Sequence, residues 1–427
     1  MSSLAPALGR ARPQRVLGRL RGSLLVRNRP LGRMLLAGFI STCGDRLHQV
    51  ALAALILGAT NSMASAGLVF VVSTIPYALF GLPVGALVDR WDRRKTMIGA
   101  DLVRGVLVAT IPLAAAVSLP LVYGLLFCLT CATMLFNPAR QAAVPDLVEP
   151  DELQAANTLF QAMSYLVDLA AFPLAGVVVA MLVERMGVFQ GTQAAFGFDA
   201  LSYALSAALL ARLPLGQRAA TAAARSLQAM PEQIAEGLRF VRQHAAIRTN
   251  TILMTLGPLL LGAMHTLWIG FAWRVSGTGT FGYGVTETSF AVGTLAGLVV
   301  LPRLGRRLNP GRVILLGFAI FGGAIAAGGL TSSLAVVAGL ALLGGLGNMT
   351  FLVPSITLAQ RHTPAELRGR VFAVRLMLTY SAFSVSNALA GGLSDTVGVG
   401  PLMVILGLGS LLLAAVASAL PSAREAA

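Results

Sequence analysis

The sequence is poor in charged residues, and lysine is the scarcest of them. Charged residues make up 11% of its 427 residues, whereas an ordinary soluble domain has about 25%. Lys95 is the only lysine in the sequence, and it follows Arg94. The phosphate-binding loop of an ATPase needs a lysine directly after a glycine, so this chain does not hydrolyse ATP through such a loop.

Residues that build enzyme and metal sites are also few. The chain has 3 cysteines and 4 histidines, and Cys128 and Cys131 form a CxxC pair inside an apolar block, where packing thiols are expected rather than a redox or metal site. A GxGxxG pattern at 277–282 has no strand before it and is interpreted as a flexible loop. We therefore expect no enzymatic activity, no cofactor and no bound metal.

Apolar residues, in contrast, are abundant and form long blocks. Hydrophobic residues make up 56% of the chain and its mean hydropathy is +0.77, which is typical of an integral membrane protein. Blocks of about 20 residues, long enough to cross a hydrocarbon core of ~30 Å, can be placed at twelve positions: 34–58, 66–88, 97–117, 119–137, 155–183, 193–213, 249–272, 283–302, 313–331, 334–358, 370–393 and 398–420. They are too long for barrel strands, so the sequence predicts an all-α integral membrane protein with twelve transmembrane helices.

Basic residues gather on one side of the predicted membrane. If the N-terminus is cytoplasmic, 27 of the 32 lysine and arginine residues lie in tails and loops on that face. The positive-inside rule then places both termini in the cytoplasm. Because this topology accounts for the net charge of +15, we expect membrane lipids and not nucleic acid as partners. The preference for arginine over lysine indicates a GC-rich bacterial genome, and therefore a bacterial inner (cytoplasmic) membrane.

A polar segment in the middle divides the spans into two halves. We expect a basic cytoplasmic tail, an N-terminal six-helix half, a cytoplasmic linker, a C-terminal six-helix half and a second cytoplasmic tail, at 1–33, 34–213, 214–248, 249–420 and 421–427. Within the linker, "MPEQIAEGLRFVRQH" has apolar residues at helical spacing, acidic residues early and basic residues late, which predicts an amphipathic helix on the membrane surface. Two six-helix halves are typical of a transporter that rocks around a site between them.

The densest group of charges follows the second span, in "GALVDRWDRRK". This segment resembles the loop motif GxxxDRxxRR of the major facilitator superfamily, with these residues in register: Gly85, Asp89, Arg90, Arg93 and Arg94. An aspartate can cap a neighbouring helix and arginines can bind carboxylates of adjacent helices, so we expect a cytoplasmic gate latch that stabilises one conformation. The alternative is a stop-transfer anchor, a role that needs no carboxylates.

The resemblance extends over much of the chain. Segments at 136–159 and 196–209 are similar to the branch of the superfamily that includes macrolide exporters, the enterobactin exporter and transporters of lysophospholipids. This resemblance implies the major facilitator fold, a small-molecule substrate and efflux coupled to protons. The chain departs from the pattern in two places: Leu301 stands where the second half would repeat the loop aspartate, and the helix-bend motif keeps Pro173 and Gly176 but not its preceding glycine.

Ionisable residues inside a membrane span are costly, and each is therefore a candidate for function. In the first span, a polar stripe at helical spacing comprises Ser41, Asp45, Arg46, His48 and Gln49. Asp45 lies about 16 Å along the helix from the start of the span, near mid-depth, where a carboxyl group could carry a proton. The alternative is that Asp45 forms an ion pair with Arg46, Arg104 or Arg375, since buried charges usually pair.

A second polar stripe lies in the fifth span and consists of Asn157, Gln161, Ser164 and Asp168. Asp168 is also near mid-depth and has no arginine nearby in the sequence, which makes it the second candidate proton carrier. We expect both stripes, with Arg375, to face a cavity between the halves.

The remaining ionisable residues of the spans are given structural roles. Asp101 and Arg104 lie near the inner end of the third span, and we assign them to the gate latch. Asp199 is interpreted as a helix-packing residue near the membrane interface. His48 and His265 are interpreted as hydrogen-bonded structural histidines.

These features favour a secondary active transporter, a proton-coupled exporter of an amphiphilic or hydrophobic small molecule such as a drug, an antibiotic or a siderophore-like compound. A lipid or lysophospholipid facilitator is the alternative, and a membrane sensor or scaffold that does not transport is a third. Protons and lipids are the other expected partners, and the chain is expected to act as a monomer.

Overall fold

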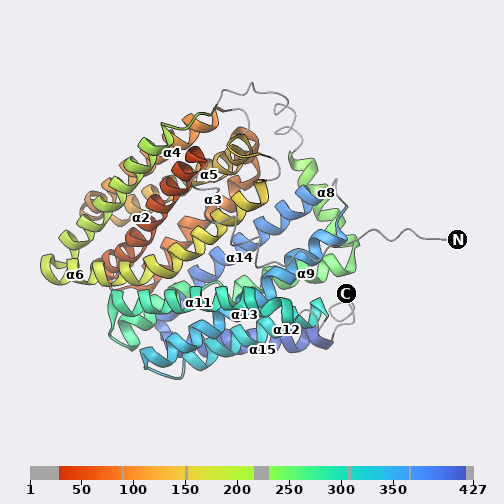
Figure 1. Cartoon of the computed structure of the whole chain (residues 1–427). Coiled ribbons are helices and arrows are strands. Elements are labelled where there is room, and N and C mark those ends of the chain that lie inside the picture. The colour runs from red at the N-terminus through yellow and green to blue at the C-terminus, as the bar shows by residue number, and fades with distance from the viewer. Residues whose placement is uncertain are drawn as a thin grey trace.

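The computed structural model describes residues 28–88, 91–149, 152–215, 230–304, 309–364 and 367–419, and every regular element within them is helical (Figure 1). The first half contains α2 (Arg29–Thr60), α3 (Met63–Val88), α4 (Arg93–Val117), α5 (Leu119–Ala143), the short 3₁₀ turn η1 (Val144–Asp146) and α6 (Leu153–Leu210). The second half contains α9 (Ala245–Leu261), α10 (Met264–Gly270), the π-helical turn η2 (Phe271–Val275), α11 (Gly279–Leu304), α12 (Pro310–Gly328), α13 (Leu334–His362), α14 (Arg368–Thr396) and α15 (Val399–Ala419).

Twelve spans are present, as the sequence predicts. By length and apolar composition alone, 9 helical stretches of the described chain could cross a membrane. One of them is α6, which contains two spans because Gly187, with φ 82°, reverses the chain direction inside it. The other two spans are α2 and α14, which this hydropathy criterion does not select and which carry intramembrane charges, Asp45 and Arg46 on α2 and Arg375 on α14.

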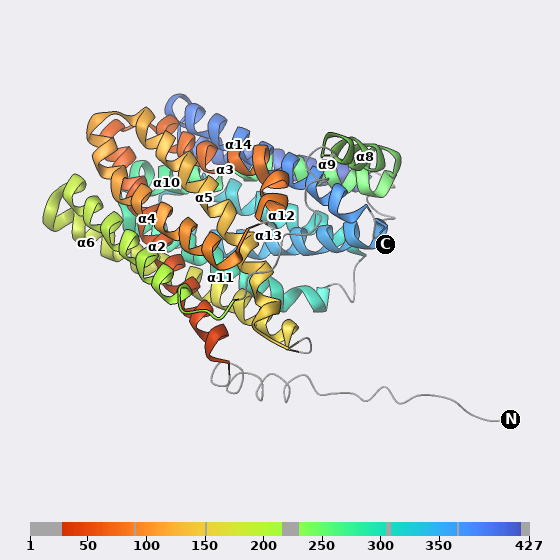
Figure 2. The same cartoon turned by 90° about the horizontal axis from the view of Figure 1, so that it is seen from above.

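The linker helix α8 (Met230–Gln243) lies where the amphipathic helix is expected. It packs against the start of α14 and the adjoining α9, at one end of the second half (Figure 2). Gly237 lies against the backbone of Arg370, where an added Cβ would be 2.7 Å from the carbonyl oxygen, and Glu236 pairs with the Arg370 guanidinium. We call the α8 end of the molecule the linker end and the opposite end the far end.

The two halves form separate bundles that meet along two helix pairs, α3 with α14 and α6 with α11 (Figures 1 and 2). Near the far end, each helix pair approaches closely at a pair of glycines. A Cβ on Gly67 of α3 would lie 2.9 Å from the Cα of Gly391 on α14, and a Cβ on Gly176 of α6 would lie 3.3 Å from the Cα of Gly284 on α11. Glycines allow helix backbones to approach this closely within a membrane.

Candidate functional site

A cavity of about 520 Å³ lies between the two halves. On the side of the first half, α2 contributes these polar side chains to the cavity wall: Asp45, Arg46, His48 and Gln49. Tyr203 of α6 lies beside them. On the second half, the polar groups include His265 of α10, Glu287 of α11 and Asn348 of α13, and apolar and aromatic side chains complete the lining. The first predicted stripe therefore contributes to the cavity wall, with the exception of Ser41, which is buried and donates a hydrogen bond to the carbonyl oxygen of Gly38.

His48 is paired with a carboxylate from a distant part of the chain. Its Nδ1 lies 2.5 Å from Oδ2 of Asp199 on α6, and the Ser202 hydroxyl donates to the other oxygen of Asp199 at 3.0 Å. Asp199 is fully buried where α6 packs against α2. Gly44 of α2 makes room for this group, because a Cβ there would lie 2.1 Å from Oδ1 of Asp199.

Asp45 forms no ion pair with Arg46, Arg104 or Arg375 within the described residues. Its Oδ1 accepts a hydrogen bond of 2.5 Å from the Tyr203 hydroxyl. The ring of Tyr203 in turn lies 4.5 Å from the guanidinium carbon of Arg104, a cation–π contact.

Asp101 and Arg104 form a buried ion pair on α4. Arg104 also lies over the ring of Phe136, at 4.3 Å. Their described contacts are within the first half and lead toward Asp45 through Tyr203, whereas the sequence assigns both residues to the gate latch. In the described structure they support the cavity wall.

Arg46 and Arg375, the other two intramembrane arginines considered as partners of Asp45, are held by neighbouring groups. Arg46 donates to Oε1 of Gln49 at 2.9 Å and lies over the ring of Phe172. Arg375 is buried inside the second half, where it donates to the Ser355 hydroxyl at 3.3 Å.

The second predicted stripe is described only in part. Asn157 is exposed, and Ser164 donates to the backbone carbonyl of Phe160 at 3.0 Å. Neither residue lines the described cavity. The side chains of Gln161 and Asp168 lie outside the described part of the structure, so the role of Asp168 stays a prediction.

The second half contributes a histidine–carboxylate pair of its own. Nδ1 of His265 lies 2.5 Å from Oε1 of Glu287, whose side chain is buried. Phe70 of α3 stacks on the His265 ring from the other half, at 5.8 Å between centroids. From the sequence, His265 is interpreted as a structural histidine and Glu287 is not among the candidates, although a glutamate inside an apolar block is a signal that can identify such a residue.

The arginines of the loop motif bind groups of the first half at the linker end. Arg93 donates to the carbonyl oxygen of Ala142 at 2.7 Å and pairs with Asp146, while Arg94 donates to the carbonyl oxygen of Ala211. Asp92 caps α4 by accepting from the backbone N–H of Lys95 at 2.9 Å. Gly85 lies in α3, and Asp89 and Arg90 lie outside the described residues.

An ionic contact joins the halves at the far end. Asp395, at the end of α14, accepts from the backbone N–H groups of Met63 and Ala64, which begin α3, each at 3.0 Å. The Ser62 hydroxyl donates to Asp395 at 2.9 Å, and Arg274 pairs with it at 2.8 Å. Partial burial works against ionisation, but these donors outweigh it and lower the pKa of Asp395 to about 2.

Comparisons with known proteins agree with this architecture. The family model of the Major Facilitator Superfamily matches residues 34–386. Macrolide efflux protein A of Streptococcus pyogenes is 25% identical over 370 residues, covering 84% of this chain and 88% of that protein. The multidrug efflux pump Tap of Mycolicibacterium fortuitum is 26% identical over 415 residues, covering 93% of this chain and 97% of the pump.

A solved nucleoside transporter superposes on the fold with a TM-score of 0.74 and 11% sequence identity, covering 91% of this chain and 98% of its own. At that identity the likeness concerns the fold alone. The family match, in contrast, spans most of both halves and includes the cavity wall of α2, the loop motif and three of the four far-end glycines, Gly67, Gly176 and Gly284. With its twelve spans and a cavity between two halves, this multi-pass membrane protein belongs to the major facilitator superfamily.

Proposed function

We propose that the protein is a secondary active transporter that exports an amphiphilic small molecule in exchange for protons. The observation that carries the proposal is the cavity between the halves, which combines buried ionisable groups with an apolar and aromatic lining. A site at the interface of two rocking halves is the arrangement on which alternating access depends. The macrolide and multidrug efflux proteins described above support export as its direction.

The lining of the cavity favours a cargo that is mainly apolar and carries a polar or weakly cationic group. Polar side chains lie on opposite walls of the cavity, among them Asp45 and Glu287. Between them lie aromatic rings such as Phe70, Phe290 and Phe383, which suit a large apolar body.

The contacts at the two ends support a transporter captured with its far end closed. The halves meet there through two glycine pairs and through Asp395. At the linker end, Arg93 and Arg94 bind groups of their own half. With the linker end in the cytoplasm, where the basic loops lie, this is an inward-facing state of a monomer in a bacterial inner membrane.

Proton coupling is proposed for the two mid-depth carboxylates, Asp45 and Asp168. A carboxyl group on a cavity wall can be exposed to each side in turn, so it can take up a proton at one face and release it at the other. Asp45 is on the described cavity wall, held by Tyr203.

The test is transport of a radiolabelled macrolide in proteoliposomes under an imposed pH gradient. Asp168→Asn should abolish uphill transport while leaving counterflow, because a permanently neutral side chain still permits alternation but carries no proton. Glu232→Gln, on the exposed surface of α8, is the control and should leave uphill transport intact. If Asp168→Asn and Asp45→Asn both still concentrate the macrolide, proton coupling through these residues is wrong. Gradient-independent movement of a lysophospholipid, without macrolide transport, would instead establish the facilitator.

A further inference from the structure

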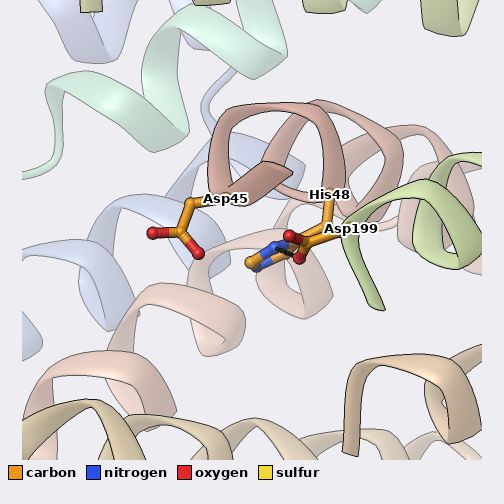
Figure 3. Close-up of side chains that lie close together, drawn as sticks. All are labelled: Asp45, His48 and Asp199. Carbon is orange, nitrogen blue, oxygen red and sulfur yellow. Dashed lines mark hydrogen bonds and ion pairs between the residues drawn. The ribbon is translucent and has the colours of Figure 1, made fainter. Parts of the chain in front are cut away.

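On the cavity wall, the first half of the protein contributes a compact group of residues that can act as metal ligands. Asp45 and His48 of α2 and Asp199 of α6 each offer one ligand atom, and these atoms lie within 4.8 Å of one another. Figure 3 shows the His48 ring between the two carboxyl groups. Residue spacing does not predict this group, because His48 and Asp199 are 151 positions apart.

Packing holds the three side chains in place without occupying all of their polar atoms. Gly44 lets Asp199 approach α2, and Ser202 binds one oxygen of Asp199. Tyr203 binds one oxygen of Asp45. Within the described structure, the second oxygen of Asp45 and Nε2 of His48 make no hydrogen bond, although His48 is only 7% exposed and both residues line the cavity.

The chemistry of the group fits a cation. One imidazole nitrogen with two carboxylates is a mixed N and O donor set, which suits first-row divalent transition metals better than Mg²⁺ or Ca²⁺. Two carboxylates gathered in a cavity of low dielectric also favour an added positive charge. An ion can reach the group because Asp45 and His48 lie on the cavity wall.

We propose that Asp45, His48 and Asp199 form a binding site for a divalent transition-metal ion. Nδ1 of His48 and Oδ2 of Asp199 are 2.5 Å apart and form a hydrogen bond. Two ligand atoms of one ion are about 3 Å apart when each metal–ligand distance is about 2.1 Å. If both atoms bind the ion directly, the distance between them must therefore increase by about half an ångström. If the ion is bound through Nε2 of His48 instead, Asp199 keeps its hydrogen bond to Nδ1 and orients the ring. The remaining coordination positions face the cavity and are open to water or cargo.

The experiment is Co²⁺ binding to the full chain, purified without a histidine tag and stripped of metal, followed by calorimetry and by the visible absorption of the bound ion. The wild type should bind one Co²⁺ per chain with high affinity. His48→Gln and Asp199→Asn should each weaken this binding by about 10- to 100-fold. Binding is measured without transport, so its outcome is independent of whether the protein exports a drug.

Two matched variants locate the site. His244→Gln removes an exposed imidazole on the linker and should leave the affinity unchanged. His265→Gln removes the other cavity histidine, so loss of Co²⁺ binding in this variant but not in His48→Gln would overturn the proposal. If His48→Gln or Asp199→Asn fails to fold, Asp45→Asn carries the test and should also weaken binding by at least about tenfold. A wild-type chain that binds no Co²⁺ at millimolar concentration would equally show that the group is only a hydrogen-bonded cluster.

Discussion

At the scale of single residues, Asp101 and Arg104 show how the first half of the protein accommodates charged side chains inside the membrane, as a buried ion pair. The pair is buried, and two of its polar atoms, Oδ2 of Asp101 and Nε of Arg104, have no partner in the described structure. Removing one charge strands the other in a medium of low dielectric, a change that typically costs about 3–5 kcal/mol. Replacing both with apolar residues removes the stranded charge as well as the attraction.

We therefore expect Arg104→Met to lower the free energy of unfolding of the purified protein by about 3–5 kcal/mol. Its melting temperature should fall accordingly. The double variant Asp101→Leu, Arg104→Met should recover most of that loss. Thermal unfolding in detergent, followed by circular dichroism, measures both. A double variant as unstable as the single one would show that Arg104 acts mainly through its contacts with Phe136 and Tyr203.

Only part of the site can be predicted from single residues in the sequence. Spacing on one helix predicts that Asp45, His48 and Gln49 share a face, and they do line the cavity. Spacing cannot show which residue faces them from another helix, and so the partners Tyr203 and Asp199 were not predicted. The alternative partner that the sequence indicates for Asp45 is an arginine, whereas the described structure places a tyrosine hydroxyl there.

At the scale of helices, the α3–α14 contact depends on the absence of side chains. A Cβ on Gly391 would lie 2.7 Å from the carbonyl oxygen of Met63, whereas a Cβ on the next residue, Gly392, would meet nothing within 4 Å. The two positions differ only in which way they face. They therefore offer a matched pair for testing whether this contact closes the far end.

We expect Gly391→Ala to force α3 and α14 apart and shift the population toward the state that is open at the far end, while Gly392→Ala does not. The measurement is the reaction of Ser73→Cys, on the cavity wall, with a thiol reagent that cannot cross the membrane, in a background that lacks the native cysteines. Added from the far side, the reagent should react faster in the Gly391→Ala background. Equal rates in the two glycine variants would contradict a closing role for this contact.

Asp395 makes the same closure sensitive to acid. Its pKa is about 2 in the closed state, below the ordinary value of about 4 that it should regain when the halves separate. The open state therefore binds the proton more readily, so Asp395 stabilises closure above about pH 4 and loses this effect as the pH falls toward 2. Its carboxylate is partly exposed to solvent, which moderates the effect.

The expected outcome is that acidifying the far side from pH 5 to pH 3 increases labelling of Ser73→Cys, measured with a reagent whose reaction does not depend on pH over this range. Asp395→Asn should show high labelling at pH 5 already and little further change. Acid sensitivity that persists in Asp395→Asn would assign the effect to another group.

The elements themselves were largely predictable, because a membrane requires long apolar helices and polar loops. The seventh span is an exception: the sequence predicts one helix at 249–272, whereas α9 ends at Leu261 and α10 begins at Met264. The interruption is stabilised by Asn387 of α14, whose amide donates to the carbonyl oxygen of Gly262 at 3.1 Å. A local pattern contains no information about such a donor, which comes from a helix 125 positions away.

At the scale of the whole molecule, the proposed orientation has a direct test. Ser332 is exposed between α12 and α13 at the far end, and Gln243 is exposed at the end of α8. In cells that produce a variant without the native cysteines, we expect Ser332→Cys to react with an impermeant thiol reagent from outside and Gln243→Cys to react only after the cells are opened. The opposite pattern would invert the topology and place the basic loops outside.

The polar character of α2 and α14 has a consequence for how the chain enters the membrane during synthesis. A charged residue at the centre of a helix adds about 2.5–3.5 kcal/mol to the free energy of its insertion by the translocon, and α2 carries both Asp45 and Arg46 within its span. Its polar face is covered by Tyr203 and by Asp199, residues made about 150 positions later. The α2 span is therefore completed by a span that is made later, and a chain stopped before α6 should hold α2 poorly in the bilayer. The first half then inserts as a unit, because α2 becomes stable in the membrane only after α6 has been synthesised and packs against it.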